Sequence, residues 1–518
     1  MNFYAAVERI AIMINGISQK VYVQAPAPTE EDSRSFQKRI LDELKEKGIQ
    51  AHMSLAVMRK LYPLCEEADW GCTLSLAWDG MGWQVVDIQA GNTQNAHYGI
   101  AVDLGSTTIA AKMINCADGE EMAYAICSNP QVDYGTDILT RIFYSKDTPQ
   151  KLEELRMAAV KGICQAVHIL EEKTGIAPSE CIQMVISGNT TMIHFLIGMD
   201  AFCVFHTPYA VRADAPGFVA AGELGLPVCG YAFLYPGKSN YLGGDIISGM
   251  VATKIYRQDE LSVFFDIGTN GELVIGNKEF LLCGAGAAGP ALEGGVVRTG
   301  MRASEGAVER VSLRNGVFEL GVIGGGEVKG ICGSGIIDLL AELFLNGWID
   351  IRGRFVPEKS DKICLKEGSA AVEYAPGLFF WQEDIDEFVK TKAAAYTMVE
   401  YMLKTSGISM EEIERFYVAG AFGRHVSTES AVTIGMYPDI PRDRIINAGN
   451  SSLEGAVCLL LDKSVLEELD AILENMTYIQ FGAVDDFLQI MIAARAIPHT
   501  HMERYPSVME NLKKRMEE

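Results

Sequence analysis

Two stretches of the chain decide its fold: Ile100-Ala-Val-Asp-Leu-Gly-Ser-Thr-Thr-Ile-Ala-Ala111 and Val263-Phe-Phe-Asp-Ile-Gly-Thr-Asn-Gly-Glu-Leu-Val274. Each has an apolar strand, an Asp-x-Gly turn with hydroxyl or amide residues, and a second strand. The two copies are separated by a domain-sized length of chain. They therefore predict a duplicated α/β fold whose halves face each other across a cleft.

The glycine turns are suited to hold the phosphates of a nucleotide. The sequence has no GxxxxGK[ST] loop, so backbone amides and hydroxyls must take the place of its lysine. Gly105 and Gly268 are expected to adopt positive φ and to let phosphate oxygens approach the backbone. The other candidate nucleotide-binding residues of the turns are Ser106, Thr107, Thr108, Thr269, Asn270 and Gly271.

Carboxylates at both turns indicate a divalent cation. Asp103 and Asp266 would repel a polyphosphate unless a cation lay between them, so we expect both to be catalytic ligands of one Mg²⁺ ion. Either turn alone could be an ordinary tight hairpin, and Asn270-Gly271 is a common type I′ turn. Two copies favour the nucleotide.

A third segment is a candidate for the adenosine end of the nucleotide. Residues 415–423 are an apolar strand that runs into Ala419, Gly420, Ala421 and Gly423, where a purine ring could lie against bare backbone. The alternative is an ordinary strand-to-helix turn. Helices with small residues on one face are expected to cross closely at a hinge. They follow the motifs at 187–194, 330–338 and 449–456.

Two further acids could orient the water that attacks the nucleotide. Asp245 and Glu293 are candidate catalytic residues, although each is as easily a turn or helix cap. Arg141, Arg298 and Arg302 either reach phosphates or pair with the many acids, and the sequence leaves both open. His499 and His501 are either metal ligands or surface groups.

The run Gly284-Ala-Gly-Ala-Ala-Gly289 matches the GxGxxG pattern of dinucleotide-binding proteins. Pro290 and Gly294 interrupt the helix that such a turn should open. We therefore favour a glycine-rich loop that lines the nucleotide cleft.

The sequence pattern of residues 1–97 differs from that of the rest of the chain and predicts a small α+β domain. We expect a hairpin within 9–23 around Asn15-Gly16, a helix from Thr29 to Lys47, and a second hairpin within 73–88 around Asp79-Gly80. Residues 98–260 and 261–518 are then the two halves of the duplicated α/β fold.

Composition excludes several classes of function. A net charge of −24 over 518 residues disfavours nucleic acid as a partner. No apolar run is long enough to cross a membrane, and the N-terminus has no secretory features, so we expect a cytoplasmic protein. Twelve cysteines without a CxxC pair predict reduced thiols.

Seven ordered motifs resemble the reductive activators of corrinoid proteins, within the superfamily of actin, sugar kinases and heat-shock chaperone ATPases. The resemblance covers Tyr98 to the C-terminus, and residues 1–97 are similar to the middle domain of that family. The motifs are those at 129–137, 187–194, 266–272, 287–294, 330–335, 418–423 and 497–499.

The resemblance implies an ATP- and Mg²⁺-dependent protein that returns a cobalt(II) corrinoid of a methyltransferase system to cobalt(I). Members of the family usually carry an iron-sulfur domain. The C-x₄-C-x₂-C spacing of a plant-type cluster is absent here, and the nearest pair is Cys65 and Cys72. We therefore expect no iron-sulfur cluster in this chain and a separate low-potential electron donor. The resemblance also suggests a homodimer.

Two alternatives remain open from the sequence. The same phosphate turns would serve a small-molecule kinase, although no sugar-binding signature is present. A nucleotide-regulated binding module without chemistry would also fit.

Overall fold

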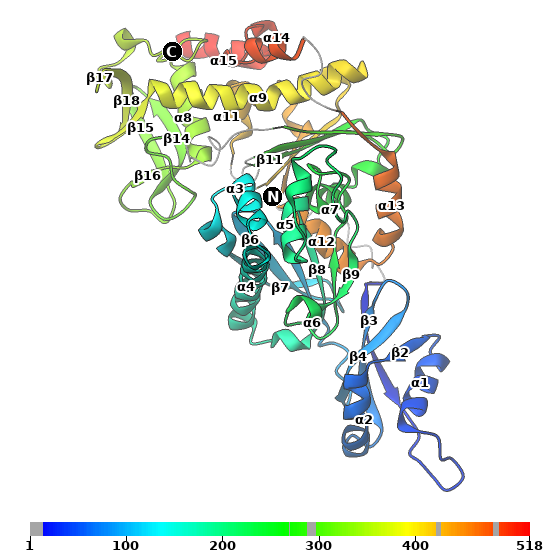
Figure 1. Cartoon of the computed structure of the whole chain (residues 1–518). Coiled ribbons are helices and arrows are strands. Elements are labelled where there is room, and N and C mark those ends of the chain that lie inside the picture. The colour runs from blue at the N-terminus through cyan, green and yellow to red at the C-terminus, as the bar shows by residue number, and fades with distance from the viewer. Residues whose placement is uncertain (1–13, 269, 287–296, 421–425, 480–485, 518) are drawn as a thin grey trace. The chain divides into compact units, whose positions relative to one another are not determined.

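The computed structural model describes residues 14–268, 270–286, 297–420, 426–479 and 486–517 (Figure 1). The chain divides into two compact units. Unit 1 comprises residues 1–252 and 451–474, and unit 2 comprises 253–450 and 475–518. Each unit has its own hydrophobic core. Among the described residues, every helix is too short or too polar to cross a bilayer.

The N-terminal part of unit 1 is a four-stranded sheet with the order β1-β3-β4-β2, on which two helices pack. β3 and β4 are antiparallel, which confirms the hairpin predicted around Asp79-Gly80. The turn is stabilised by Asp79, whose Oδ1 accepts hydrogen bonds from the backbone N–H groups of Met81 and Gly82. The elements are β1 (Ser18–Gln24), α1 (Phe36–Glu46), β2 (Ala51–Met53), α2 (Leu55–Glu67), β3 (Gly71–Trp78) and β4 (Trp83–Ala90).

The segment around Asn15-Gly16 differs from the expected hairpin. In the described residues β1 pairs with β3, and Asn15 forms an isolated bridge with Asp462; residues 9–13 lie outside the described part. A Cβ atom on Gly16 would lie 2.2 Å from the carbonyl oxygen of Leu460. The glycine is therefore explained by a close backbone approach and not by a turn between paired strands.

The first helix begins later than the sequence predicts. Its N-cap is Ser35, whose side chain accepts a hydrogen bond from the N–H of Lys38, and not Thr29. The Thr29 hydroxyl instead accepts from the N–H of Asp32 in a separate turn. The predicted end is confirmed, because the last helical residue precedes Lys47 and Gly48, and Gly48 has a φ of 79°.

The remainder of unit 1 is built on a six-stranded sheet with the order β7-β6-β5-β8-β10-β9. β5, β6 and β7 form an antiparallel meander, and β8 and β10 continue the sheet parallel to β5. β9 pairs antiparallel with β10 at the edge. The strands are β5 (Tyr98–Leu104), β6 (Thr108–Asn115), β7 (Glu120–Ser128), β8 (Cys181–Gly188), β9 (Gly217–Ala220) and β10 (Tyr231–Leu234).

Unit 2 repeats this arrangement in its sheet β21-β20-β11-β12-β13-β22. β11, β12 and β13 form the antiparallel meander, and β20 and β21 continue it parallel to β11. The two quoted stretches are thus equivalent hairpins of two equivalent sheets, which confirms the predicted duplication. The strands are β11 (Ser262–Ile267), β12 (Gly271–Gly276), β13 (Leu281–Gly286), β20 (Arg415–Ala419), β21 (Ile445–Gly449) and β22 (Met476–Tyr478).

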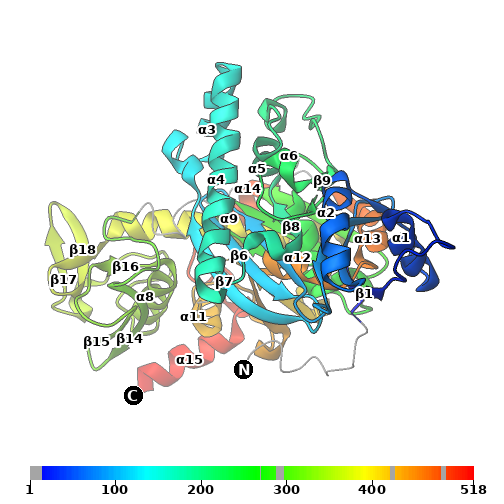
Figure 2. The same ribbon diagram turned by 90° about the horizontal axis from the view of Figure 1, so that it is seen from below.

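Two helices cover opposite faces of the unit 1 sheet, α4 (Pro149–Thr174) and α12 (Ser451–Leu461). Ile100 and Val102 of β5 share one core with α4, which runs along β6 and β7 (Figures 1 and 2). Asp103 points to the other face and contacts α12. Successive residues of a strand alternate between faces, so the register of β5 directs the Asp103 carboxylate toward α12.

Unit 2 also holds two three-stranded sheets, β15-β14-β16 and β17-β18-β19. Their strands are β14 (Ala307–Arg314), β15 (Val317–Val322), β16 (Gly330–Ile331), β17 (Ile363–Lys366), β18 (Ser369–Ala375) and β19 (Leu378–Trp381). The other α-helices of the described chain are α3 (Ile138–Lys146), α5 (Thr190–Leu196), α6 (Ala221–Leu224), α7 (Gly244–Thr253), α8 (Gly333–Leu345), α9 (Gln382–Ser406), α11 (Thr428–Thr433), α13 (Val465–Asn475), α14 (Asp486–Ala493) and α15 (Pro506–Glu517).

The small residues of α12 permit the close helix crossing that the sequence predicts. A Cβ atom on Gly455 would lie 1.9 Å from the carbonyl oxygen of Ser248 in α7. The carbonyl of Gly455 also accepts a hydrogen bond of 2.6 Å from the Tyr235 hydroxyl. The contact is confirmed within unit 1, and its role as a hinge stays a prediction.

Candidate functional site

The first phosphate turn joins β5 to β6 through residues 105–107. A Cβ atom on Gly105 would lie 2.5 Å from the carbonyl oxygen of Thr108. Only glycine fits this tight approach. The expectation of positive φ is wrong for both Gly105 and Gly268, because neither lies in the left-handed region. Ser106 and Thr107 are half-buried and Thr108 is exposed.

Two buried side chains hold this turn from behind. The Asn129 side chain donates a 2.8 Å hydrogen bond to the Gly105 carbonyl, and its backbone N–H donates another of 2.8 Å to the Thr107 carbonyl. Arg141 Nη1 donates a 2.6 Å hydrogen bond to the Ser106 carbonyl. All three carbonyl oxygens are engaged. Their partial negative charges therefore do not oppose an anion at the turn.

Asp103, beside this turn, belongs to a chain of serine hydroxyls. Ser452 donates a 2.8 Å hydrogen bond to Oδ1 of Asp103. The Ser452 hydroxyl lies 3.0 Å from that of Ser187, which lies 2.7 Å from that of Ser248. All three serines are buried, and Asp103 is partly exposed. These hydrogen bonds fix one oxygen of a carboxylate near the C-terminal end of β5.

The same chain of hydroxyls reaches Asp245, in the first turn of α7. Ser248 donates a 3.0 Å hydrogen bond to the backbone carbonyl of Asp245, whose Oδ1 lies 3.0 Å from the N–H of Ile246. The structure therefore brings two of the candidate catalytic residues, Asp103 and Asp245, to one region of unit 1. Whether Asp245 orients a water molecule stays a prediction.

The second turn, in unit 2, joins β11 to β12. The N–H of Gly268 donates a 2.9 Å hydrogen bond to the carbonyl of Asn270, and Ile267 pairs with Gly271 at the start of β12. The turn therefore occupies residues 268–270, and Asn270-Gly271 is not a two-residue hairpin turn. Asp266 is partly exposed beside it and Asn270 is exposed. Thr269 lies outside the described residues.

The candidate adenosine element lies directly beside Asp266. β20 pairs with β11 so that Ala419 is opposite Asp266, and the next residue, Gly420, has a φ of 89°. A Cβ atom on Gly420 would lie 2.7 Å from Oδ1 of Asp266 and 2.8 Å from the carbonyl oxygen of Ile267. Bare backbone is required here. Ala421, Gly423 and Glu293 lie outside the described residues.

Gly188 is a residue of the site that the sequence reasoning missed. A Cβ atom on it would lie 2.8 Å from the carbonyl oxygen of Leu104, as one on Gly420 would lie 2.8 Å from that of Ile267. Leu104 and Ile267 each follow the aspartate of their repeat. The duplication thus includes the end of a third strand in each unit. Its signal was an apolar strand that ends in a small residue and a glycine.

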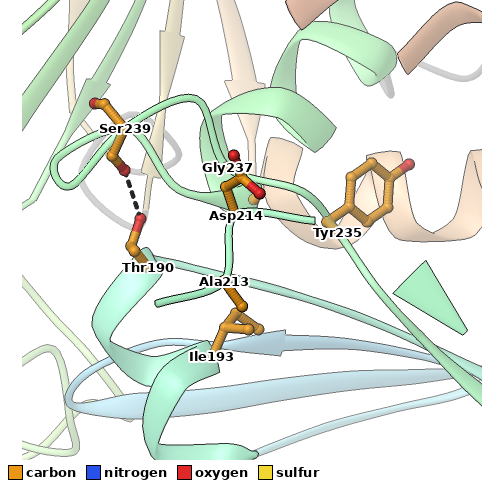
Figure 3. A pocket seen from close by; sticks show the side chains of 8 residues that line it. Thr190, Ile193, Ala213, Asp214, Tyr235, Gly237 and Ser239 are labelled. Carbon is orange, nitrogen blue, oxygen red and sulfur yellow. Dashed lines mark hydrogen bonds between the residues drawn. The ribbon is translucent and has the colours of Figure 1, made fainter. Parts of the chain in front are cut away.

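Unit 1 also has a small hollow near the start of α7, with a cavity volume of about 10 Å³ and a lining of eight residues (Figure 3). Ligand pockets usually measure 300–1,000 Å³. Thr190 closes part of this hollow by donating a 2.9 Å hydrogen bond to the Ser239 carbonyl. The lining includes Gly244 but neither Asp103 nor Asp245. We therefore regard it as a packing gap behind α5 and not as the nucleotide site.

The sequence leaves open whether Arg141, Arg298 and Arg302 reach phosphates or pair with acids, and the structure places the three in different surroundings. Arg298 is half-exposed, approaches Glu367 and Glu383, and lies over the ring of Trp381. Arg302 is exposed. Arg141 is fully buried and donates to backbone carbonyls. Within the described part of the chain, Arg141 is the one of these three arginines with a hydrogen bond to a phosphate turn.

The structure gives little support to the two other candidate sites, the histidine pair as a metal site and the GxGxxG run as a dinucleotide-binding turn. Among the described residues, no group of three or more histidines, cysteines or acids has the arrangement of a metal site. His499 is buried, and its Nδ1 accepts a hydrogen bond from the N–H of His501. Residues 284–286 continue β13 and pair with β12, which disagrees with a dinucleotide-binding turn. Residues 287–289 lie outside the described part.

Three family domains match the chain in order. They are the RACo linker region over residues 7–95, the RACo middle region over 98–258, and the C-terminal domain of RACo, the ASKHA domain, over 260–509. A solved structure of a reductive activator for a corrinoid, iron-sulfur protein is 30% identical, with a TM-score of 0.87, and the match covers 95% of this chain and 81% of that one. The chain belongs to the RACo family. The ASKHA domain confirms the predicted actin-like fold.

Two curated proteins are also similar to this chain. The corrinoid activation enzyme RamQ of Eubacterium limosum is 28% identical over 428 residues, which are 79% of this chain and 72% of the relative. The [Co(II) methylated amine-specific corrinoid protein] reductase of Methanosarcina barkeri is 25% identical over 417 residues, 73% of each chain. The names of these two relatives state corrinoid activation for one and reduction of a Co(II) corrinoid protein for the other.

Proposed function

We propose that this protein uses ATP to return the cobalt(II) ion of a corrinoid protein to cobalt(I). The observation that carries the proposal is its membership of the RACo family over residues 7–509. The two Asp-x-Gly hairpins at equivalent places of two equivalent sheets support the ATP requirement. The enzyme is then an ATPase whose turnover is linked to its corrinoid partner.

The described residues fit MgATP in their chemistry. Asp103 and Asp266 are partly exposed carboxylates, the ligand type that Mg²⁺ prefers, and each is the second-to-last residue of a strand beside a glycine turn. Gly105 and Gly420 leave the backbone bare where a Cβ would collide. A bound Mg²⁺ ion would neutralise phosphate charge. That one ion joins both aspartates stays a prediction.

The proposed reaction adds one electron to cobalt(II), and the source of that electron must be a donor of low potential. We propose that a separate protein supplies it, because the cysteines of this chain lack the spacing of a plant-type cluster. Cys65 and Cys72, the nearest pair, are both buried in the core of the N-terminal sheet. We also propose a homodimer, which the family resemblance suggests.

The proposal can be tested by optical spectroscopy. The full chain is mixed with a cobalt(II) corrinoid protein from a methyltransferase system, a low-potential reductant and MgATP. We expect the cobalt(II) absorption to be replaced by that of cobalt(I) only when ATP is present. ADP release that depends on a sugar or another small molecule, with transfer of the phosphoryl group to that molecule and without any change at cobalt, would favour the kinase. Tight ATP binding without phosphate release in any mixture would favour the binding module.

A further inference from the structure

Arg141 in α3 is a buried cation with incomplete pairing. Its side chain is fully buried, yet it forms no ion pair with a described carboxylate. Nε donates a 2.8 Å hydrogen bond to the Gly135 carbonyl, and Nη1 donates one of 2.6 Å to the Ser106 carbonyl. Nη2 has no hydrogen-bond partner among the described residues. The side chain is therefore satisfied on one edge only.

Burial disfavours the charged form of this arginine but does not discharge it. It lowers the pKa of Arg141 to about 10, so the guanidinium remains protonated at neutral pH. The nearest negative influence is Asp137, which caps the N-terminus of α3. A buried charge without a close counter-charge is costly, and a neutral amide could serve the same carbonyls. An anion bound nearby would compensate the positive charge of the guanidinium.

The position of Arg141 says where that anion would be. Nη1 contacts the carbonyl of Ser106, the central residue of the β5–β6 turn. That carbonyl belongs to the same peptide group as the N–H of Thr107. A strong hydrogen bond to a carbonyl polarises its peptide group, which makes the N–H a better donor. The arginine thus strengthens an N–H of the turn without itself being at the surface.

The neighbours of the guanidinium hold it in place. Gln131 Oε1 and Met192 Sδ lie 3.5 and 3.7 Å from Nη1, and the Gln131 amide itself donates to the Leu155 carbonyl at 2.9 Å. Gln131 is fully buried. With Nε fixed on Gly135 as well, the side chain has little freedom to leave the turn.

We infer that Arg141 is a positioning residue for nucleotide phosphates: it fixes the Ser106–Thr107 peptide group and supplies the positive charge that a β- or γ-phosphate at the turn complements. The inference rests on the proposed ATP binding. It assigns Arg141 no contact with the reacting atoms. The effect of the arginine should therefore grow with the number of phosphates on the ligand.

The test compares nucleotides that differ only in their phosphates. Dissociation constants for MgATP and AMP are measured on the full chain, by competition with a fluorescent ATP analogue, for wild type, Arg141→Met and Arg141→Lys. We expect Arg141→Met to weaken MgATP at least tenfold and AMP less than threefold. Arg141→Lys keeps the charge but loses the two-carbonyl fork, so we expect an intermediate loss for MgATP. The matched control is Arg156→Met, since Arg156 pairs with Glu153 on the surface of α4.

The possible results distinguish a failure of the proposed ATP binding from a failure of the role assigned to Arg141. If the wild type does not bind MgATP, the proposed function fails and the inference fails with it. If the wild type binds MgATP and Arg141→Met changes both ligands equally, Arg141 has only a structural role and the inference alone is overturned. If Arg141→Met cannot be recovered folded, Arg141→Lys decides: an unchanged ratio of MgATP to AMP affinity would overturn it. A weaker salt dependence of MgATP binding in Arg141→Met would support it further.

Discussion

The hydroxyl of Ser452 donates a 2.8 Å hydrogen bond to Oδ1 of Asp103, across 349 residues of sequence. Ser452 lies in the first turn of α12, which follows directly on β21 of unit 2, whereas Asp103 is the second-to-last residue of β5. The orientation of a candidate Mg²⁺ ligand in unit 1 is therefore set by a residue at a point where the chain passes from one unit to the other.

The first prediction concerns this hydrogen bond. Ser452→Ala removes a donor to a carboxylate, and such a bond contributes about 1.5–3 kcal/mol. We expect MgATP turnover to fall roughly tenfold, with a higher Mg²⁺ concentration at half-maximal rate, because Asp103 loses its fixed orientation. Phosphate release measured across a Mg²⁺ series tests this.

Ser451 provides the matched control for Ser452. It is the neighbouring buried serine, and its hydroxyl has no hydrogen-bond partner among the described residues. Ser451→Ala should therefore leave turnover and Mg²⁺ dependence close to wild type. Equal losses in the two variants would contradict a specific role for the bond to Asp103.

The second prediction concerns the two aspartates themselves. Asp103→Asn keeps an oxygen that can accept from Ser452 but removes the charge, and Asp266→Asn removes the equivalent charge in unit 2. We expect each to weaken MgATP binding or turnover more than tenfold, about 1.4 kcal/mol, without loss of fold. A chelator should abolish wild-type turnover. Circular dichroism checks the fold.

The double variant tests whether both aspartates serve one ion. If they hold the same Mg²⁺ ion, the losses of Asp103→Asn and Asp266→Asn should not add in the double variant. Additive losses would contradict a shared ion while leaving nucleotide binding at each turn intact. Unchanged affinity and turnover in both single variants would contradict the role of the turns altogether.

Much of the fold follows from the sequence because the duplicated hairpins carry a strong local pattern. Alternating apolar residues and the Asp-x-Gly turn are sufficient to predict β5–β6 and β11–β12. The late start of α1 at Phe36 was missed because Thr29 and Ser35 are both good caps, and only the tertiary fold selects between them.

Less of the candidate site can be predicted from the sequence, because its main contacts join residues that are far apart in the chain. Gly16 was expected in a turn, yet it is explained by the Leu460 carbonyl, which nothing near it in sequence reveals. In the sequence, Ser187 and Gly188 were visible only as the small residues at the start of the motif 187–194, and Ser452 only as a small residue of the motif 449–456. Their hydrogen bonds and close approaches depend on which strands become neighbours.

The third prediction concerns the bare backbone beside Asp266. Gly420→Ala introduces a Cβ 2.7 Å from Oδ1 of Asp266, in addition to the strain of a φ of 89°. Left-handed backbone costs a non-glycine residue about 1–2 kcal/mol, and overpacking typically adds about 1–3 kcal/mol. We expect loss of MgATP turnover and a lower unfolding temperature.

A control substitution at Gly407 distinguishes the backbone strain from the overpacking. It has a φ of 71° at the end of α9, and nothing lies within 4 Å of a Cβ placed on it. Gly407→Ala should therefore show the backbone cost alone and keep its turnover. If Gly420→Ala retains normal MgATP turnover, the displacement of Asp266 does not matter and the candidate adenosine element loses its support.

The last prediction concerns pH, through His499. Burial, with the nearby charge of Lys392, lowers the pKa of His499 to about 4. An unfolded histidine has a pKa near 6.5, so between these values the unfolded chain binds a proton that the folded chain does not. The stabilisation is present above pH 6.5 and is lost as the pH falls toward 4, by at most about 3 kcal/mol. We expect His499→Gln, whose amide oxygen can still accept from the His501 N–H, to lose less stability than wild type between pH 7 and pH 4.5 in thermal unfolding.

His97 in unit 1, whose pKa burial also lowers to about 4, should still contribute to the pH dependence of stability in that variant. An unchanged slope in His499→Gln would mean that His499 accepts its proton without unfolding.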